Sequence, residues 1–166
     1  MIRPMRATFR TLLALALGVG MQVATPVLAQ DPPRIVIGSA VIEPMPIAVP
    51  TFIDEGGAGD YASQISKVVI ADLEGTGFFR NIGEEAHISR ITSFDGGVAF
   101  EDWKAINAQV LVTGAVSVAG DRITVKFRAY DVFNGQVLEG AALQFAGTTQ
   151  GWRRMSHKVA DVIYSK

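Results

Sequence analysis

Few side chains in this sequence could take part in catalysis or bind a metal ion. The chain has 166 residues, two histidines and no cysteine, which excludes disulfides, cysteine nucleophiles and thiolate metal sites. His157 and Asp161 lie four residues apart, so on a helix they can meet as an oriented general base or as a surface ion pair. We favour the ion pair, because Ser156 points to another side of such a helix and no Ser-His-Asp triad follows.

The other histidine and the two tryptophans give no better indication of a bound ligand. His87 has Glu84 and Glu85 nearby, without the spacing that a metal site needs, and we expect a solvated acidic turn here. Trp103 and Trp152 each fit the apolar side of a predicted helix, so we expect them in the core rather than in a ligand-binding platform. We therefore predict no cofactor and no metal site.

Two pairs of adjacent carboxylates and one glycine-rich segment remain as possible catalytic groups. The pairs are Asp54 with Glu55 and Glu101 with Asp102, and adjacent side chains diverge too far to act unaided as general acid and base. Residues 56–59 precede a predicted helix but lack the Gly-Lys-Ser/Thr ending of a phosphate-binding loop, so we expect a flexible linker. The sequence thus predicts no enzyme. The alternative is a periplasmic hydrolase that uses Asp54, Glu55 or Asp60.

The elements that position these residues are predicted from the spacing of apolar side chains. Ile65, Val69 and Leu73 recur every four residues, which predicts a helix that ends near Gly75. Asp60 precedes this helix, and we expect its side chain to cap the N-terminus.

The last segment of the sequence predicts a second long helix. Its apolar side holds Trp152, Met155, Val159, Val162 and Ile163, and its charged side holds Arg153, Arg154, Lys158 and Asp161. Burial of such side chains stabilises the fold by about 1.5–3 kcal/mol each, so this helix should contribute strongly to the core. The sequence reaches Lys166 without a glycine cap, and we expect the parent protein to continue beyond it.

The remaining segments predict a small mixed sheet. Strands are expected at 47–49, 78–82, 110–116, 122–129 and 137–145. Residues 83–100 show little periodicity and should form a loop before a short helix at 101–106. Asn134 and Gly135 predict a type I′ hairpin turn, because both residue types tolerate a positive φ. The expected fold is α/β (α+β-like), with a mixed sheet of about five strands packed by two main helices.

The first 29 residues have the pattern of a secretory signal peptide. Arg3, Arg6 and Arg10 precede the apolar run 12–17, and small residues lead up to Ala29, so we predict cleavage after Ala29 and a periplasmic protein. The apolar run is shorter than the roughly 20 residues of a membrane-spanning helix. The alternative is an uncleaved single-span anchor.

The mature chain predicted from this cleavage is acidic and begins with a short arm. Residues 30–166 contain 12 basic and 16 acidic side chains, a net charge of −4, which argues against nucleic acid as a partner. The arm, residues 30–41, contains a β-prone run at 34–37 that can add to a partner's sheet or form an edge strand of this domain. We therefore expect a signal peptide at 1–29, a mobile arm at 30–41 and an α/β domain at 42–166.

Three stretches together resemble the N-terminal domain of the TolB family, whose members are periplasmic components of the Tol-Pal system. They are residues 46–52, residues 65–82 and residues 152–164, which read PIAVPTF, ISKVVIADLEGTGFFRNI and WRRMSHKVADVIY. The segments 102–116 and 130–135 also fit the family in order and spacing. The resemblance covers nearly all of residues 34–166, and it rests on the ordered set rather than on one motif.

The resemblance implies a non-enzymatic adaptor between inner-membrane TolA and outer-membrane Pal. In this family a mixed sheet with two main helices precedes a six-bladed β-propeller that binds Pal, and the mature N-terminal segment binds the C-terminal domain of TolA. The system supports outer-membrane invagination during cell division and outer-membrane integrity.

Residue assignments follow from the same resemblance. By position, TolA would bind the arm through Asp31, Arg34, Ile35, Val36 and Ile37. Pal is expected as a partner only where the propeller is present, and membrane association only through partners. The alternative within the binding class is a stand-alone periplasmic scaffold domain of similar fold.

Overall fold

The structure is a computed structural model that describes residues 43–166, so the predicted signal peptide and arm lie outside the described residues. Its strands are β1 (Met45–Ala48), β2 (Ile53–Asp54), β3 (Phe79–Asn81), β4 (Val110–Ala119), β5 (Arg122–Asp131) and β6 (Gln136–Thr148). Its helices are α1 (Tyr61–Gly75), α2 (Phe100–Ala105) and α3 (Trp152–Tyr164), with 3₁₀ turns at Glu84–Ala86 and Thr149–Gly151.

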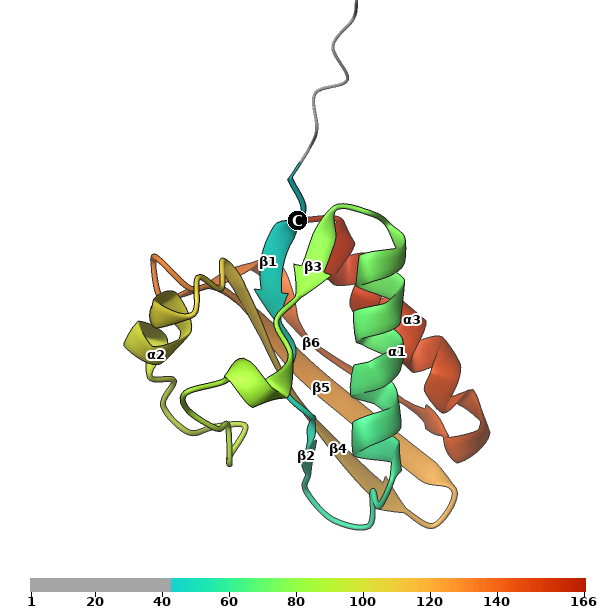
Figure 1. Cartoon of the computed structure of the whole chain (residues 1–166). Helices are drawn as coiled ribbons and strands as arrows, with labels where there is room; N and C mark the ends of the chain where they lie inside the picture. Colours follow the sequence, from blue (N-terminus) through green and yellow to red (C-terminus); the bar gives the residue numbers. More distant parts are fainter. Residues whose placement is uncertain (1–42) are drawn as a thin grey trace, which may run out of the picture. The chain divides into compact units, whose positions relative to one another are not determined.

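The strands form one mixed sheet of six strands in the order β3-β1-β4-β5-β6, with β2 pairing with β4 (Figure 1). β1 runs parallel to both β3 and β4, whereas β4, β5 and β6 are antiparallel neighbours. Parallel neighbours need a crossover, and α1 provides it between β1 and β3. The predicted mixed sheet and its two main helices are confirmed, and the short β2 accounts for the additional strand.

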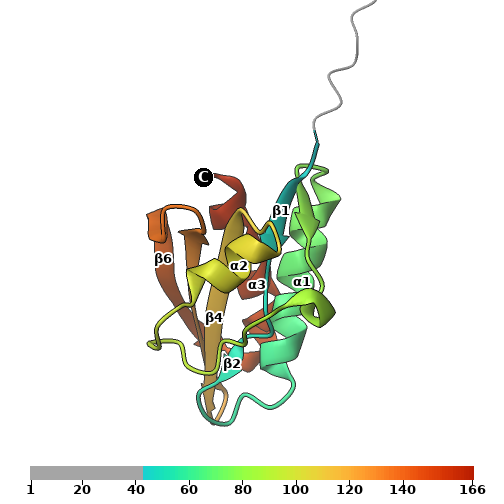
Figure 2. The same ribbon diagram turned by 60° about the vertical axis from the view of Figure 1, so that its left-hand side comes forward.

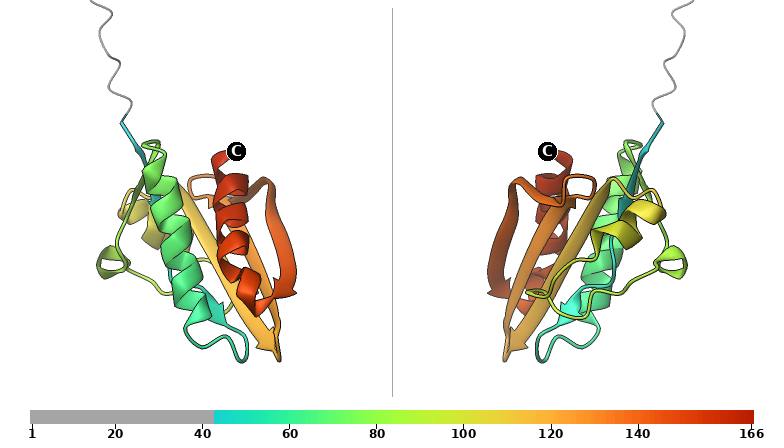
Figure 3. Two further views of the ribbon diagram at one scale, coloured as in Figure 1. Left: turned by 90° about the vertical axis from the view of Figure 1, so that its right-hand side faces the viewer. Right: turned by 90° about the vertical axis from the view of Figure 1, so that its left-hand side faces the viewer.

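Helices and a loop cover the two faces of the sheet (Figures 2 and 3). On one face α1 and α3 lie side by side and bury Ile65, Val69 and Val159 against the sheet (Figure 3). On the other face lie α2 and the loop that precedes it, and Trp103 of α2 is fully buried and packs with Leu111. β4 is covered on both faces, which explains why its apolar residues run without alternation.

The predicted cap of α1 is wrong in its chemistry. Asp60 occupies the N-cap position, but its backbone has helical angles of φ −74° and ψ −13° and its side chain makes no capping hydrogen bond. A capping side chain accepts a backbone N–H only when its own residue is extended, so this conformation turns the carboxylate away. The C-terminal prediction is confirmed, because α1 ends at Gly75 and Gly77 follows with a φ of +75°.

The β5–β6 hairpin exists, but its turn is not type I′. Asp131 pairs with Gln136, which leaves a loop of four residues, 132–135, and Asn134 lacks the positive φ that a type I′ turn requires. The carboxylate of Asp131 accepts the backbone N–H groups of Phe133 and Asn134 at 2.9 and 3.0 Å. This side chain satisfies the amides of a longer turn, which the Asn-Gly pattern alone does not reveal.

A close approach of Phe52 to the centre of β4 fixes the connection between β1 and β2. Phe52 is buried and its ring lies over Gly114, where an added Cβ would overlap the ring carbons. The backbone N–H of Phe52 donates to the hydroxyl of Ser66 in α1 at 2.8 Å. A side chain at Gly114 would therefore require the buried ring of Phe52 to move.

We expect Gly114→Ala to lower the free energy of unfolding by about 1–3 kcal/mol, because a methyl group forces Phe52 out of its place. Urea denaturation of the purified chain measures this change. The matched control is Gly75→Ala at the end of α1, where nothing lies within 4 Å of the added Cβ and the change should be neutral or slightly stabilising. Equal stability of the two variants would contradict the steric argument.

Candidate partner-binding site

The carboxylate of Asp54, the first candidate for hydrolysis, is bound to the backbone of the loop that follows it. One of its oxygens accepts the N–H groups of Gly56 and Ala58 at 2.7 and 3.0 Å, and the other accepts that of Gly59 at 3.1 Å. These bonds, led by that of Ala58, hold the pKa of Asp54 below its ordinary value. Residues 56–59 are therefore tied down by Asp54, and the prediction of a flexible linker is wrong.

The other two acidic candidates are not brought together with Asp54 around a reactive centre. Glu55 forms an ion pair with Lys126 of β5, with an Oε2 to Nζ distance of 2.8 Å. Asp60 makes no side-chain bond to the helix that it precedes. A general acid and base need carboxylates that share one substrate position, and this arrangement does not provide them.

His157 joins the two long helices instead of pairing with Asp161. Its Nδ1 lies 2.5 Å from a carboxylate oxygen of Asp72 in α1. The partner is non-local, so the spacing within α3 could not reveal it. Ser156 is buried and donates its hydroxyl to the carbonyl of Trp152 at 3.1 Å, which excludes it as a nucleophile for His157.

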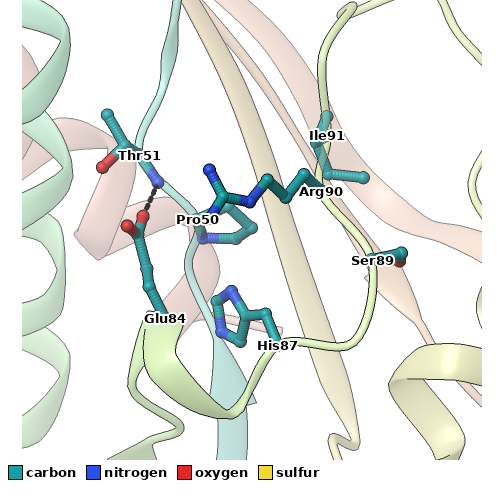
Figure 4. A pocket seen from close by; sticks show the side chains of 7 residues that line it. All are labelled: Pro50, Thr51, Glu84, His87, Ser89, Arg90 and Ile91. Atoms are coloured by element: carbon teal, nitrogen blue, oxygen red, sulfur yellow. Dashed lines mark hydrogen bonds between the residues drawn. The ribbon is translucent and has the colours of Figure 1, made fainter.

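A small polar pocket surrounds the second histidine, and Figure 4 shows the side chains that line it. They are Pro50, Thr51, Glu84, His87, Ser89, Arg90 and Ile91, around a cavity of about 220 Å³. Glu84 accepts the backbone N–H of Thr51 at 2.5 Å, and the Thr51 side chain and backbone together lower the pKa of Glu84. The expected solvated acidic turn is instead attached through Glu84 to the segment after β1.

His87 itself is held by neighbouring groups of the fold. Its Nε2 lies 3.0 Å from the carbonyl oxygen of Ile82, so Nε2 carries the proton in this bond. The ring packs edge-on against Trp103 at 4.8 Å between centroids. Within residues 43–166, no group of three or more histidine, aspartate and glutamate side chains is arranged to hold a metal ion.

Several exposed apolar side chains lie at one end of the domain. Figure 1 shows the start of β1 and the C-terminus at this end. We call this the apolar end surface. Its exposed or partly exposed residues are Met45, Phe78, Phe133, Leu138 and Tyr164, and the buried side chain of Ile163 borders it. Phe133 and Tyr164 are 58% and 52% exposed, and the rings of Phe78 and Tyr164 lie 6.0 Å apart. A cavity of about 240 Å³ opens between Met45 and Ile163. Contiguous exposed apolar groups of this kind are typical of protein-contact surfaces.

Sequence reasoning missed the apolar end surface, although one signal was present. Phe133 is an aromatic residue inside a hairpin turn, where polar residues are usual. The predicted binding residues Asp31 and Arg34, with the run 35–37, lie outside the described residues. None of the helices in residues 43–166 is long and apolar enough to cross a membrane.

Comparison with known proteins identifies a family that this chain matches. The family model described as the TolB amino-terminal domain matches residues 33–138. A relative from Cereibacter sphaeroides, named Tol-Pal system protein TolB, is 57% identical over 95% of this chain and 36% of its own length. A relative of the same name from Ruegeria is 58% identical over 93% of this chain and 34% of its own length. The chain thus spans about a third of the curated relatives that it matches.

Solved structures share the fold. The crystal structure of TolB from Acinetobacter baumannii matches with a TM-score of 0.60 and 24% identity, over 74% of this chain and 28% of that one. The C-terminal domain of LpoB from Salmonella enterica matches with a TM-score of 0.53 and 12% identity, over 67% of this chain and 87% of that one. At these identities the likeness shows the fold alone.

The bonds of Asp54 predict a dependence of stability on pH. Its pKa is lowered by folding, so its contribution to stability is complete above the ordinary value of 3.8 and is lost as the pH falls through the folded-state value. We expect Asp54→Asn to lower the melting temperature at pH 7, and its further loss in acid to be smaller than that of the parent chain. Thermal unfolding followed by circular dichroism between about pH 7 and pH 2 measures both effects.

Asp60→Asn is the matched control for this experiment, because the Asp60 side chain makes no capping bond. Its melting temperature should follow that of the parent chain at each pH. A parent-like profile for Asp54→Asn would show that the three backbone bonds contribute nothing to stability.

Proposed function

The chain belongs to the TolB amino-terminal domain family, and from this membership we propose that it is a non-enzymatic component of the Tol-Pal system in the cell envelope. The observation that carries the proposal is the 57% identity to a Tol-Pal system protein TolB over 95% of this chain. The periplasm is the proposed location, in keeping with the leader-like residues 1–29.

The use of the candidate catalytic side chains supports binding over hydrolysis. Asp54 accepts three backbone N–H groups, Glu55 pairs with Lys126, and His157 pairs with Asp72. Each of these groups already stabilises a loop or a helix contact. A domain whose polar groups are occupied in this way, and which exposes an apolar end surface, is suited to contacts with other proteins.

The proposed contact with the C-terminal domain of TolA uses the arm, residues 30–41. Its binding residues are Asp31, Arg34, Ile35, Val36 and Ile37. An extended run of this kind can add to a sheet edge of the partner, where backbone hydrogen bonds give affinity and alternate side chains give specificity. The proposed adaptor joins TolA to Pal and supports outer-membrane invagination and integrity. Its contact with Pal depends on a propeller domain, as in the family.

The position of β1, which follows the arm in the sequence, supports the proposal that the arm binds TolA. β1, which begins three residues after residue 42, lies between β3 and β4. The backbone N–H of Met45 donates to the carbonyl of Phe78 at 2.8 Å, and Ile47 and Ala48 are buried. A partner that holds the arm is therefore connected directly to the interior of the sheet.

Calorimetric titration with the TolA C-terminal domain tests the proposed contact. We expect the chain to bind, and a variant that lacks residues 30–41 to bind at least about tenfold more weakly, a loss of about 1.4 kcal/mol. Ile35→Asp should weaken binding in the same direction, because it places a charge within the β-prone run.

Phe133→Ser is the control that separates the arm from the apolar end surface. Phe133 is 58% exposed, so its replacement should leave the fold intact and, if the arm is the site, the affinity for TolA unchanged. Equal affinity with and without residues 30–41 would reject the arm as the TolA site. Loss of binding in Phe133→Ser would assign the contact to the apolar end surface.

A further inference from the structure

β6 forms a free margin of the sheet along half of its length. Residues 142–148 pair in regular antiparallel register with residues 122–128 of β5, and β6 is the last strand in the sheet order. Figures 2 and 3 show β6 at the border of the sheet, beside α3. Within residues 43–166, no further strand pairs with it. We call residues 142–148 the β6 edge.

The backbone groups that point away from the sheet can be assigned from one hydrogen bond. The N–H of Thr149 donates to the carbonyl of Asp121 at 2.7 Å, in the direction of β5. Backbone groups alternate along an antiparallel strand, so those of Leu143, Phe145 and Gly147 also point toward β5. The N–H and carbonyl groups of the alternate residues Ala142, Gln144, Ala146 and Thr148 therefore point outward. Ala142, Gln144 and Ala146 take part in no loop, cap or side-chain hydrogen bond of residues 43–166, whereas Thr148 is the N-cap of the 3₁₀ turn that follows.

The β6 edge lacks the features that usually protect a free strand. Residues 141–149 contain no charged residue and no proline. The register shift opposite Ala129, where Gly140 has a φ of +72°, lies before the edge and leaves it regular. Soluble proteins normally place lysine, proline or a bulge on such an edge to prevent pairing with other chains. An unprotected edge is a feature of domains that accept a strand from a partner.

Positive charge lies along one side of the β6 edge. Arg154 and Lys158 of α3, together with residues 144–148, line a groove of about 360 Å³. Neither cation forms an ion pair with a carboxylate of residues 43–166. Lys158 instead lies over the ring of Phe145, with its Nζ 5.8 Å from the ring centroid. Near Thr148, at the end of the β6 edge, the carboxylate of Asp121 lies in the same pocket as Arg122 and balances its charge. The excess positive charge beside the β6 edge is therefore that of Arg154 and Lys158 on α3.

We propose that the β6 edge binds an extended acidic segment of another protein. The segment adds to the sheet as a strand beside β6, its backbone pairs with Gln144 and Ala146, and its carboxylates face Arg154 and Lys158. This site is separate from the arm and goes beyond the proposed TolA contact. A second copy of the chain fits less well, because two-fold pairing of β6 edges would bring the cations of both α3 helices together.

The test uses two labelled peptides of about nine residues, the length of one strand. One alternates Val and Glu and the other alternates Val and Lys. Fluorescence polarisation with the purified chain should show binding of the acidic peptide alone. Amide exchange followed by NMR should be slowed at Gln144 and Ala146 when that peptide is bound, because their N–H groups become hydrogen-bonded.

Two variants and one control test the site itself. The double variant Arg154→Glu/Lys158→Glu should bind the acidic peptide at least about tenfold more weakly. Ala146→Pro should have a similar effect, because proline removes an outward N–H without removing a bond to β5. Lys67→Glu changes an exposed cation of α1 and should bind like the parent chain. The double variant decides the result if Ala146→Pro fails to fold by circular dichroism.

Three results would overturn the proposal. They are equal binding of the two peptides, parent-like binding by the double variant, and protection of amides away from the β6 edge. A mass that doubles with concentration in the parent chain, and not in Ala146→Pro, would assign the edge to a second copy and reject the acidic partner.

Discussion

The burial of β4 on both faces is the constraint on which the rest of the structure depends. β4 pairs with β1, β2 and β5, and residues 110–116 are buried along its length. A strand whose two faces are both apolar needs other elements packed on each face of the sheet. α1 and α3 supply one cover, and α2 with its preceding loop supplies the other. Of the polar groups that could have done chemistry, His157 joins α3 to α1, Asp54 binds the loop after β2, and Glu55 pairs with Lys126 of β5.

Elements that follow from local spacing could be predicted from the sequence. The apolar repeat through Ile65 and Val69 predicts α1, and the repeat through Met155 and Val159 predicts α3. Both predictions succeed because the residues that recur with the helical period are the ones that the helix buries. The alternation in 122–129 likewise identifies β5, whose apolar side chains Ile123 and Phe127 are fully buried. The family could also be predicted from the sequence, because the stretches 46–52, 65–82 and 152–164 resemble it in their order along the chain.

Features that depend on contacts between distant residues could not be predicted in the same way. The partner of His157 is Asp72 on another helix, and the form of the hairpin turn depends on the side chain of Asp131 rather than on Asn-Gly. The apolar end surface combines Met45 and Phe133, which neither period nor motif connects. The free side of β6 likewise could not be predicted, because it follows from the order of the strands in the sheet.

The position of β1 has a consequence for the order in which the domain can fold. Ile47 pairs with Val110, so this strand meets its neighbour in β4 only after more than half of the chain has been synthesised. Pairings of such long sequence separation carry a large loop-closure entropy and make folding slow. Until β4 is available, the first part of the domain stays open. Because of this topology, synthesis of β4 is a precondition for the assembly of the sheet.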